Sequence, residues 1–415
     1  MWDEKVKKID YCRLCKSKKL EKVLDLGKTP PANSFLKKSQ LKDKEDFFPL
    51  IVNFCKDCNH LQLSHVVSPE ILFRHYVWVS STSPVTVAHF EEYAKSVFNT
   101  FNLKKRDLVV EVGSNDGVLL KPFKKLGATV LGVDPARNVA RRATKEGVLT
   151  LPHFFNVKVA SEIVKKYGKA KVITINNCFA HVSDLDEVMN GVSVLLDSEG
   201  VLVIEAPYNI DLLEKNLFDI VYHEHVSYLS IRPLDRFFKN FGMRIFDVLK
   251  RSVHGGTVRI FVKMSDASYK INKSVQEFIG LEEDRKLSDI NTYFSFAKKI
   301  ERNKIELVKL LGKLKIENKS IAGYGAPAKS TTLLHYFNIG QEMLDFIVDD
   351  SPFKQGLFTP GKHIPVVHPK ELYIKKPDYL LILAWNFAES IIKMHKQYKD
   401  SGGKFIVPVP APKIT

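Results

Sequence analysis

Short apolar runs alternate with amphipathic segments through the middle of the chain. Segments with helical spacing of their apolar residues, such as 184–196, lie between runs that have the length and β-branched content of buried strands. These runs cover residues 108–112, 130–134, 172–175 and 201–205. Strands that alternate with helices in this way form a parallel sheet with crossover helices. The pattern predicts an α/β unit from about residue 75 to 250.

A second unit of the same kind is expected in the last third of the chain. Residues 257–262 form a predicted strand at its start, and residues 274 to about 314 form a long charged stretch with helical spacing. Apolar runs at 319–325, 346–350 and 379–383 then resume the alternation. The sequence thus predicts two α/β units in succession, with no short-period repeat.

The first 70 residues contain short strand-like pieces and too little apolar material for a core of their own. Four of the five cysteines stand here in two C-x2-C pairs, Cys12 with Cys15 and Cys55 with Cys58. A two-residue spacer lets both thiolates of a turn point inward, so the two pairs can close a tetrahedral shell around Zn²⁺. Because all four ligands are thiolates, no coordination position stays open, and the metal would be structural.

The charge of the chain is strongly positive: 63 Lys+Arg against 47 Asp+Glu give 415 residues a net charge of +16. Such a balance attracts anionic ligands, but the lysines are dispersed, so we expect no nucleic-acid partner. No run of about 18 uncharged apolar residues is present, and the N-terminus lacks the apolar core of a secretory signal. We expect a cytoplasmic protein without a membrane span and, since no dimerisation segment stands out, a monomer.

A glycine-containing turn follows the first central strand, in the motif EVGSNDG at 111–117. Its glycines permit close approach of a ligand, and the helix start behind it favours polar or anionic groups. About twenty residues later, Asp134 ends the second strand, where a carboxylate can accept both hydrogen bonds from a ribose diol. The strict G-x-G-x-x-G turn of dinucleotide sites is absent, which favours S-adenosylmethionine. The structural alternative is a loop built for packing alone.

The residues that we expect to bind this cofactor follow the first three central strands, because open α/β sheets bind ligands at the carboxyl ends of their strands. They are Gly113, Asn115, Asp116, Asp134, Pro135 and Asn177.

Titratable side chains cluster behind the third and fourth strands. His181 follows the third strand, and Tyr222, Glu224 and His225 stand in the motif YHEH after the fourth. A histidine can take a proton from a carbon beside a carbonyl group, and a tyrosine or second histidine can donate to the enolate oxygen. The H-x-H spacing could also chelate a metal, although no third ligand is evident, and a polar helix cap is the structural alternative.

Two further motifs lie in the last 165 residues. The segment GYGAPAK at 323–329 again puts glycines between a strand and a helix start, where Lys329 could hold a diphosphate. A dinucleotide site is the competing interpretation, but the third glycine of that fingerprint is missing. His254 precedes a glycine pair at the junction of the two α/β units, where the glycines could also serve only as a hinge.

In order along the chain, these motifs resemble those of the S-adenosylmethionine-dependent nucleotide-sugar C-methyltransferases. The matching segments are CRLC with FCKDC, LDLGKTPPANSFL, EVGSNDG, GVDPA, NCFAHV, YHEHVSYLS, VHGGTVRIFV and GYGAPAKS, and they span nearly the full length. The resemblance implies a zinc-binding module over 1–70 and a class I methyltransferase domain over 71–253. It also implies a second Rossmann-like α/β domain over 254–415 that contributes to nucleotide-sugar binding.

The resemblance also implies a substrate and a mechanism. The substrate would be a 4-keto-deoxysugar linked to a nucleotide, with dTDP as the expected carrier, whose ketone acidifies the proton on C3. His225 corresponds to the general base of the family, with Tyr222, Glu224 and His181 around it, and the enolate carbon would attack the methyl group of the cofactor. The residues leave open whether His225 or Tyr222 removes the proton. The expected substrate-binding residues are Tyr76, Asn177, His181, Tyr222, His254 and Lys329.

Two other function classes remain open on the sequence. An NAD(P)-dependent sugar oxidoreductase or epimerase would hold a dinucleotide in the C-terminal unit and predicts NAD(P) binding. A zinc-knuckle nucleic-acid methyltransferase predicts strongly salt-dependent binding to polyanions. No interleaved basic and aromatic patch around the four paired cysteines supports the second class.

Overall fold

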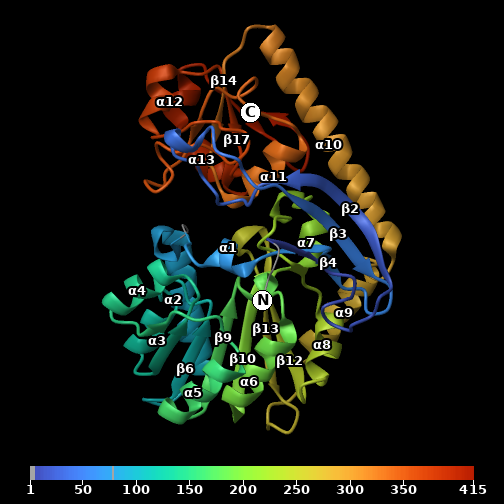
Figure 1. Ribbon diagram of the computed structural model, residues 1–415, viewed down its shortest axis with the longest axis vertical. Helices are drawn as coiled ribbons and strands as arrows, with labels where there is room; N and C mark the ends of the chain where they lie inside the picture. The colour runs from blue at the N-terminus through green and yellow to red at the C-terminus, as the bar shows by residue number, and fades with distance from the viewer. Residues whose placement is uncertain (1–4, 77–78) are drawn as a thin grey trace.

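The computed structural model describes residues 5–76 and 79–415, apart from the side chain of His254. A C-terminal α/β part lies above a larger central α/β part, and the N-terminal strands run between them and along one side (Figure 1). The long helix α10 (Ile290–Ile316) runs along the upper part of that side and links the two α/β parts. Of the described helices, none is long and apolar enough to cross a membrane.

The N-terminal part is built on an antiparallel sheet of strand order β11-β4-β3-β2, in which β11 (Ser227–Tyr228) comes from far along the chain. Its strand pairing therefore fastens the residues just after the YHEH motif to the N-terminal part. The other elements here are β1 (Val6–Lys8), β2 (Leu20–Thr29), η1 (Lys38–Gln40), β3 (Phe48–Cys55), β4 (Leu61–Leu63), β5 (His65–Val67) and α1 (Pro69–Phe73).

The central sheet has seven strands in the order β12-β13-β10-β9-β6-β7-β8. All are parallel except β13, which runs antiparallel to both neighbours; this is the class I methyltransferase arrangement that we expected. The strands are β6 (Leu108–Val112), β7 (Thr129–Val133), β8 (Thr150–Leu151), β9 (Ala170–Asn176), β10 (Leu196–Pro207), β12 (Met243–Arg251) and β13 (Thr257–Met264).

The strand that we assigned to the start of the C-terminal unit is β13, and it belongs to the central sheet instead. Seven of its eight residues are buried, because it lies between β10 and β12. The glycine pair before it closes the β12–β13 connection, and a Cβ at Gly256 would meet the Asp211 carboxyl carbon at 2.3 Å. The glycines thus allow a close approach here rather than forming a hinge, and the residue at which the C-terminal domain begins stays a prediction.

Helices cover both faces of the central sheet. Helix α2 (Pro84–Thr100) packs with α3 (Leu120–Lys125) over one face, where Val109, Val172 and Val203 join its core. Helices α5 (Val157–Tyr167) and α6 (Leu185–Leu195) pack on the other. The remaining elements of this part are η2 (Ser80–Thr82), α4 (Arg137–Lys145), η3 (Phe179–His181), α7 (Asn209–Glu214), η4 (Phe218–Ile220), α8 (Ile231–Lys239), η5 (Val253–Gly255) and α9 (Lys273–Asp284).

The long charged stretch is two helices rather than one. Helix α9 ends at Asp284 and packs on β12, and α10 begins after Asp289, whose side chain accepts from the Asn291 amide. Residue Lys286 between them has a positive φ of 53°, which ends the first helix. The break lets α9 complete the central part while α10 runs on to the C-terminal sheet.

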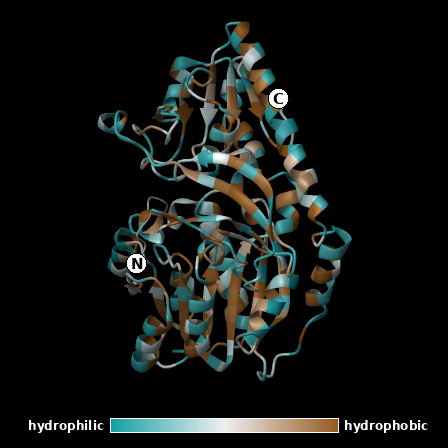
Figure 2. Ribbon diagram, turned by 45° about the vertical axis from the view of Figure 1, so that its right-hand side comes forward, coloured by the Kyte–Doolittle hydropathy of each residue, from teal (hydrophilic) through white to brown (hydrophobic). Residues whose placement is uncertain are grey.

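The C-terminal sheet has the order β16-β15-β14-β17-β18-β19, with only β19 antiparallel. This Rossmann-like order places a switch point between β14 and β17, where open α/β sheets bind ligands. Apolar residues concentrate along the strands of both large sheets (Figure 2). The elements are β14 (Ile321–Tyr324), α11 (Ala328–Tyr336), β15 (Ile347–Val348), β16 (Val366–Val367), α12 (Lys370–Lys375), β17 (Tyr379–Ile382), η6 (Trp385–Phe387), α13 (Ala388–Met394), α14 (Lys396–Asp400), β18 (Lys404–Val407) and β19 (Lys413–Ile414).

Candidate active site

The four paired cysteines converge on one point of the N-terminal part. Their sulfur atoms all lie within 4.8 Å of one another, and the Sγ–Sγ distances are 3.5 Å for Cys12–Cys58 and 3.5 Å for Cys15–Cys55. A tetrahedral zinc site with Zn–S bonds of about 2.3 Å has S–S edges of about 3.8 Å. The thiolate set therefore fits Zn²⁺, as predicted, and leaves no ligand position for a substrate.

The turn after β6 is tight and packs closely against the residues after β9. Gly113 has a φ of 75° and Asn115 a φ of 48°, and a Cβ at Gly113 would meet the Cys178 sulfur at 2.5 Å. Both Asp134 oxygens accept backbone N–H groups at 2.8 Å, one from Asn115 and one from Ala136. Burial raises the pKa of Asp134 against these two bonds. Each oxygen keeps a second lone pair, so Asp134 can still accept a ribose hydroxyl.

Asp116 carries the clearest signal for a cationic ligand. It is 0% exposed, and neither carboxylate oxygen has a hydrogen-bond partner among the described residues. Glu111 lies nearby; burial raises its pKa well above the ordinary value, and the charges of Asp134 and Asp116 add to the effect. Such a group of acids fits the ammonium and sulfonium of S-adenosylmethionine, since an unpaired buried carboxylate is otherwise costly.

The other predicted cofactor residues lie around the same turn. Asn177 follows β9 with a φ of 49°, and its N–H donates to the Glu205 carbonyl at 2.7 Å. Pro135 directly follows Asp134 in the segment before α4. The Asn115 side chain accepts from the N–H of Ser80 at 3.0 Å, so the segment before α2 covers the turn. The family resemblance pointed to Tyr76 in the segment HYVWVSSTSP as part of a loop over the sugar site, but it did not predict the contact of this segment with the cofactor turn.

Tyr222 and His225 form a hydrogen-bonded pair. His225 Nδ1 lies 2.7 Å from the Ile220 carbonyl oxygen, and because a carbonyl only accepts, Nδ1 must carry a proton. In the neutral ring Nε2 is then the acceptor, and the Tyr222 hydroxyl lies 2.9 Å from it. Burial raises the pKa of Tyr222 well above its ordinary value. The pair thus holds a neutral tyrosine against the basic nitrogen of a histidine.

His181 adds a second imidazole to this pair. Its ring centroid is 5.0 Å from that of His225, and Phe73 of α1 stacks on its other side at 5.7 Å. Burial, followed by the neighbouring His225, lowers the pKa of His181 well below its ordinary value. His181 is therefore neutral at pH 7 and adds no positive charge that would weaken the base beside it.

Glu224 accepts two hydrogen bonds from segments far away in the sequence. The Tyr76 hydroxyl donates to Oε2 at 2.8 Å, and the Asn33 amide donates to Oε1 at 2.7 Å. Burial raises the pKa of Glu224 to about 7, with both donors acting in the opposite direction. The main-chain N–H and carbonyl of Tyr76 form hydrogen bonds with the Asn138 side chain in α4, directly after the Asp134 loop. Tyr76 thus joins the predicted cofactor turn to the predicted sugar site.

His223 does not join this cluster, although it belongs to the same motif. Its Nε2 donates to the Phe48 carbonyl at 3.2 Å, and burial lowers its pKa to about 4. The side chain therefore faces the N-terminal sheet, and the H-x-H spacing does not bring His223 and His225 together as a chelate.

Lys329 lies at the contact between the C-terminal part and the loop that carries the cluster. Its ammonium is 3.8 Å from Asp219 and 4.0 Å from the centre of the Trp385 ring, and burial lowers its pKa. The Trp385 indole donates to Asp219 at 2.6 Å. Trp385 and Asp219 were not predicted, because they meet Lys329 only through packing. The side chain of His254, predicted to face the sugar, lies outside the described part.

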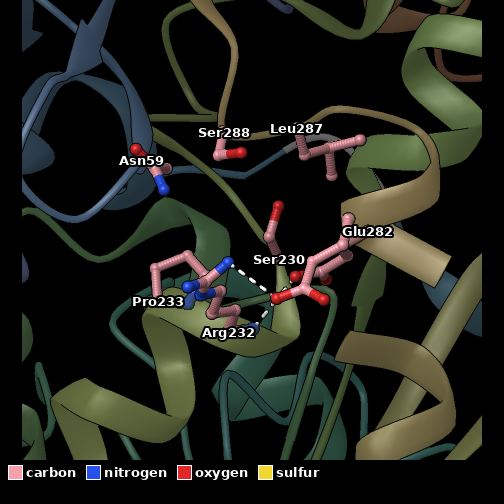
Figure 3. A pocket seen from close by; sticks show the side chains of 8 residues that line it. Asn59, Ser230, Arg232, Pro233, Glu282, Leu287 and Ser288 are labelled. Carbon is pink, nitrogen blue, oxygen red and sulfur yellow. Dashed lines mark hydrogen bonds and ion pairs between the residues drawn. The ribbon is translucent and has the colours of Figure 1, made fainter. Parts of the chain in front are cut away.

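A separate pocket lies beside α8 and α9 and contains none of the predicted site residues (Figure 3). Glu282 lines this pocket. Its carboxylate accepts hydrogen bonds from the main-chain N–H groups of Ile231 and Arg232 at the start of α8 and from the Tyr208 hydroxyl. Burial raises its pKa against these bonds. This carboxylate caps a neighbouring helix, which is a structural role.

Comparisons with known proteins match the chain in three successive stretches. Residues 12–73 match a zinc binding domain, residues 88–248 a methyltransferase domain, and residues 252–410 a C-methyltransferase C-terminal domain. The match to a solved structure of magnesium protoporphyrin IX methyltransferase from Synechocystis PCC 6803 covers 43% of this chain and 80% of that protein's chain, at 14% identity and a TM-score of 0.32.

One relative matches about a third of the chain, and another matches nearly its full length. A ubiquinone biosynthesis O-methyltransferase from Pelagibacter ubique (strain HTCC1062) is 28% identical over 154 residues, 35% of this chain and 60% of that protein. The C-methyltransferase NovU from Streptomyces niveus is 38% identical over 409 residues, 99% of this chain and 97% of that protein. The chain therefore belongs to the family of S-adenosylmethionine-dependent C-methyltransferases that carry an N-terminal zinc-binding domain.

Proposed function

We propose that this C-methyltransferase acts on C3 of a nucleotide-linked 4-keto-deoxysugar, with a dTDP sugar as the expected substrate. The observation that carries the proposal is the hydrogen-bond geometry of His225. Nδ1 lies 2.7 Å from the Ile220 carbonyl oxygen, which places the ring proton on Nδ1 and leaves Nε2 as the basic nitrogen of a half-buried ring. A base placed in this way can remove a carbon-bound proton, the step that methyl transfer to carbon requires. The similarity over nearly the full length to a C-methyltransferase favours carbon over oxygen as the acceptor.

His225 is the proposed base, and Tyr222 the proposed donor to the developing enolate oxygen. A proton beside a ketone is far too weakly acidic for imidazole in water, so the site must stabilise the oxyanion. One well-aimed donor is worth about 3 kcal/mol in such a site. Tyr222 has the proton to give, because burial keeps its hydroxyl protonated at every pH of interest. In the substrate-free site this proton lies towards His225 Nε2, so the bound sugar must replace that bond: Nε2 then faces the C3 proton and the Tyr222 hydroxyl the ketone oxygen.

Glu224, His181 and Tyr76 are proposed to line the sugar. The Tyr76 hydroxyl donates a hydrogen bond to Glu224. A lone pair of the Tyr76 oxygen can then accept from other donors, such as sugar hydroxyls. His181 stays neutral, so it can accept or donate a hydrogen bond without opposing protonation of His225. Asn177, directly after β9, is proposed to contact both the sugar and the cofactor.

The cofactor is proposed to lie on the turn after β6. Bound there, S-adenosylmethionine supplies an electrophilic methyl group. Asp134 would accept the ribose hydroxyls and Asp116 the methionyl ammonium, and Gly113, Asn115 and Pro135 shape the turn. These residues orient the methyl group, which is what a sulfonium needs, since it requires no further activation.

Lys329 and Trp385 are proposed to hold the nucleotide part of the substrate. Among the described residues Asp219 is the one countercharge paired with Lys329, at 3.8 Å, so the ammonium can still take a diphosphate oxygen. His254 remains a proposed sugar contact on the strength of its motif. The zinc module is proposed to keep its structural role, with Cys12, Cys15, Cys55 and Cys58 as the ligands.

Hydrogen exchange at C3 tests this assignment without methyl transfer. The enzyme with S-adenosylhomocysteine and a dTDP 4-keto-deoxysugar in D₂O should catalyse deuterium incorporation at C3, measured by mass spectrometry. His225→Ala should slow the exchange by about 10²–10⁴-fold, the usual contribution of a general base. His153→Ala, at an exposed histidine elsewhere, is the matched control. Exchange at the wild-type rate in His225→Ala would show that the base is a different group.

A further inference from the structure

We propose that Asn33, a residue of the zinc-binding module, is a positioning residue of the active site that acts through Glu224. The inference rests on the proposed function, because Glu224 is placed there beside the sugar. It adds a role for the N-terminal module beyond binding its metal, since the module then completes the site.

The contact between Asn33 and Glu224 is direct. The Asn33 amide nitrogen lies 2.7 Å from Glu224 Oε1, and these residues are 191 positions apart. The other oxygen, Oε2, accepts the Tyr76 hydroxyl at 2.8 Å. Both oxygens therefore accept, which is the pattern of an ionised carboxylate. Glu224 is only 2% exposed, so these two donors stand in for the water that the charge has lost.

The turn that carries Asn33 is fixed by the C-terminal part. The Ser34 N–H donates to the Pro31 carbonyl at 3.1 Å, which closes the turn. The Ala32 carbonyl accepts from the hydroxyl of Thr331 in α11 at 3.1 Å. The neighbouring Thr332 hydroxyl donates to the Val221 carbonyl at 2.7 Å, just before the YHEH motif. One helix thus holds both the Asn33 turn and the loop of Glu224.

Strand β2 connects this turn to the metal site. It begins at Leu20, whose partner in β3 is the zinc ligand Cys55, and it ends at Thr29, just before the Pro-Pro turn. Along its length β2 packs against α10 and α11 (Figure 1). The zinc site fixes one end of β2, and Asn33 follows the other end. The strand therefore connects the metal site to the residue that donates a hydrogen bond to Glu224.

The consequence is a predicted shift in the pH dependence of the reaction. Glu224 faces the side chains of Asn33, Tyr76 and Tyr222, and the Asn33 donor favours its ionised form. Removal of the donor raises the pKa of Glu224 further above about 7, so less carboxylate is present at neutral pH. A hydrogen bond to a buried charge corresponds to about one to two pKa units. The ionised form of Glu224 is the one that accepts the Tyr76 hydroxyl, so the reaction requires it in addition to a neutral His225. The acidic limb of kcat/KM should therefore move up by at least about one pH unit.

Two substitutions at Asn33 test this. Asn33→Ala removes the donor, and Asn33→Asp keeps the shape but sets a carboxylate against Glu224, so its shift should be larger. At pH 6 both variants should lose about tenfold or more in kcat/KM, and at pH 9 Asn33→Ala should approach the wild type. Affinity for S-adenosylhomocysteine and zinc content should stay unchanged. Asn53→Ala, on β3 of the same module, is the matched control.

The outcomes separate this inference from the proposed function. Wild-type enzyme that methylates no 4-keto sugar would contradict the proposed function. An active wild type whose acidic limb is unmoved in Asn33→Ala, or a loss that is equal at every pH, would overturn the role of Asn33 alone. Infrared titration gives the same answer without substrate. The carboxylate band of Glu224 is identified as the band that is missing from the spectrum of Glu224→Gln. The band should titrate about one unit higher in Asn33→Ala, and an unchanged midpoint would also overturn the inference.

Discussion

The substitution Asp116→Asn should change cofactor affinity and apoprotein stability in opposite directions. Asp116 is fully buried beside Glu111 and Asp134, with no donor on either of its oxygens among the described residues. If it accepts the methionyl ammonium, the amide forfeits a charge-assisted bond of about 1.5–3 kcal/mol. That loss corresponds to about a 10- to 150-fold weaker Kd.

The apoprotein should become more stable for the same reason. An unpaired buried carboxylate opposes folding, and the amide of nearly equal size removes its charge. We expect the free energy of unfolding without ligand to rise by about 1–2 kcal/mol. Calorimetric titration with S-adenosylhomocysteine and denaturant unfolding of the ligand-free protein measure the two effects. The matched control is Asp266→Asn, an exposed aspartate after β13.

Two results would refute this reasoning. An unchanged Kd in Asp116→Asn would remove Asp116 from the cofactor site. A lower apoprotein stability would mean that the carboxylate has a structural partner after all. Loss of affinity with gain of stability is the combination expected only of a binding residue.

Three further predictions concern other parts of the molecule. Cys12→Ser should lower zinc content and expose the first 70 residues to proteolysis, because the metal stabilises a module with little core. Full protease resistance without zinc would refute the structural role of the metal. Arg259→Met should destabilise the protein by about 3 kcal/mol, because Glu205, 2.7 Å from Arg259 and fully buried like it, would keep the His89 ring as its side-chain partner but lose its full countercharge; denaturant unfolding measures this, and a loss below 1 kcal/mol would contradict it. The pKa of Glu224 is raised to about 7 in the folded protein from an ordinary 4.5, so deprotonation opposes folding as pH rises through that window. Wild type should therefore lose about 3 kcal/mol relative to Glu224→Gln between pH 4 and 8, and parallel stability curves would exclude the raised pKa.

Features that depend on local spacing were predictable from the sequence. The two cysteine pairs identify a zinc site because each two-residue spacer fixes its own turn, and the structure brings the four sulfurs together. The alternation of apolar runs and helices predicted the parallel α/β character of the central sheet, although not the order of its strands. The turn after β6 was visible because its glycine and asparagine residues adopt positive φ angles that few other residues tolerate.

Features that depend on packing between distant segments were not predictable. The Asn33–Glu224 bond joins residues 191 positions apart, and the Trp385–Asp219 bond joins residues 166 apart. Neither pair has a spacing that a single sequence can reveal. The strand at 257–264 was assigned to the wrong sheet for the same reason, because only its partners β10 and β12 show where it belongs.

Adjacent residues of one motif also took different roles. His223 and His225 are two positions apart, yet His223 donates to Phe48 in the N-terminal sheet while His225 is paired with Tyr222. The residue pattern alone did not separate them, and only the family resemblance pointed to His225. The direction of each side chain from the loop supplies the physical reason for the difference.

The position of the transferred methyl group tests the central claim most directly. The protein would be incubated with S-adenosylmethionine labelled with ¹³C in its methyl group and with a dTDP 4-keto-deoxysugar, and the product analysed by NMR. The account predicts a labelled methyl group bonded to C3, with loss of the C3 proton. A methyl group on a sugar oxygen would contradict the carbon-acid mechanism, and no transfer to any nucleotide-linked 4-keto sugar would contradict the proposed substrate class.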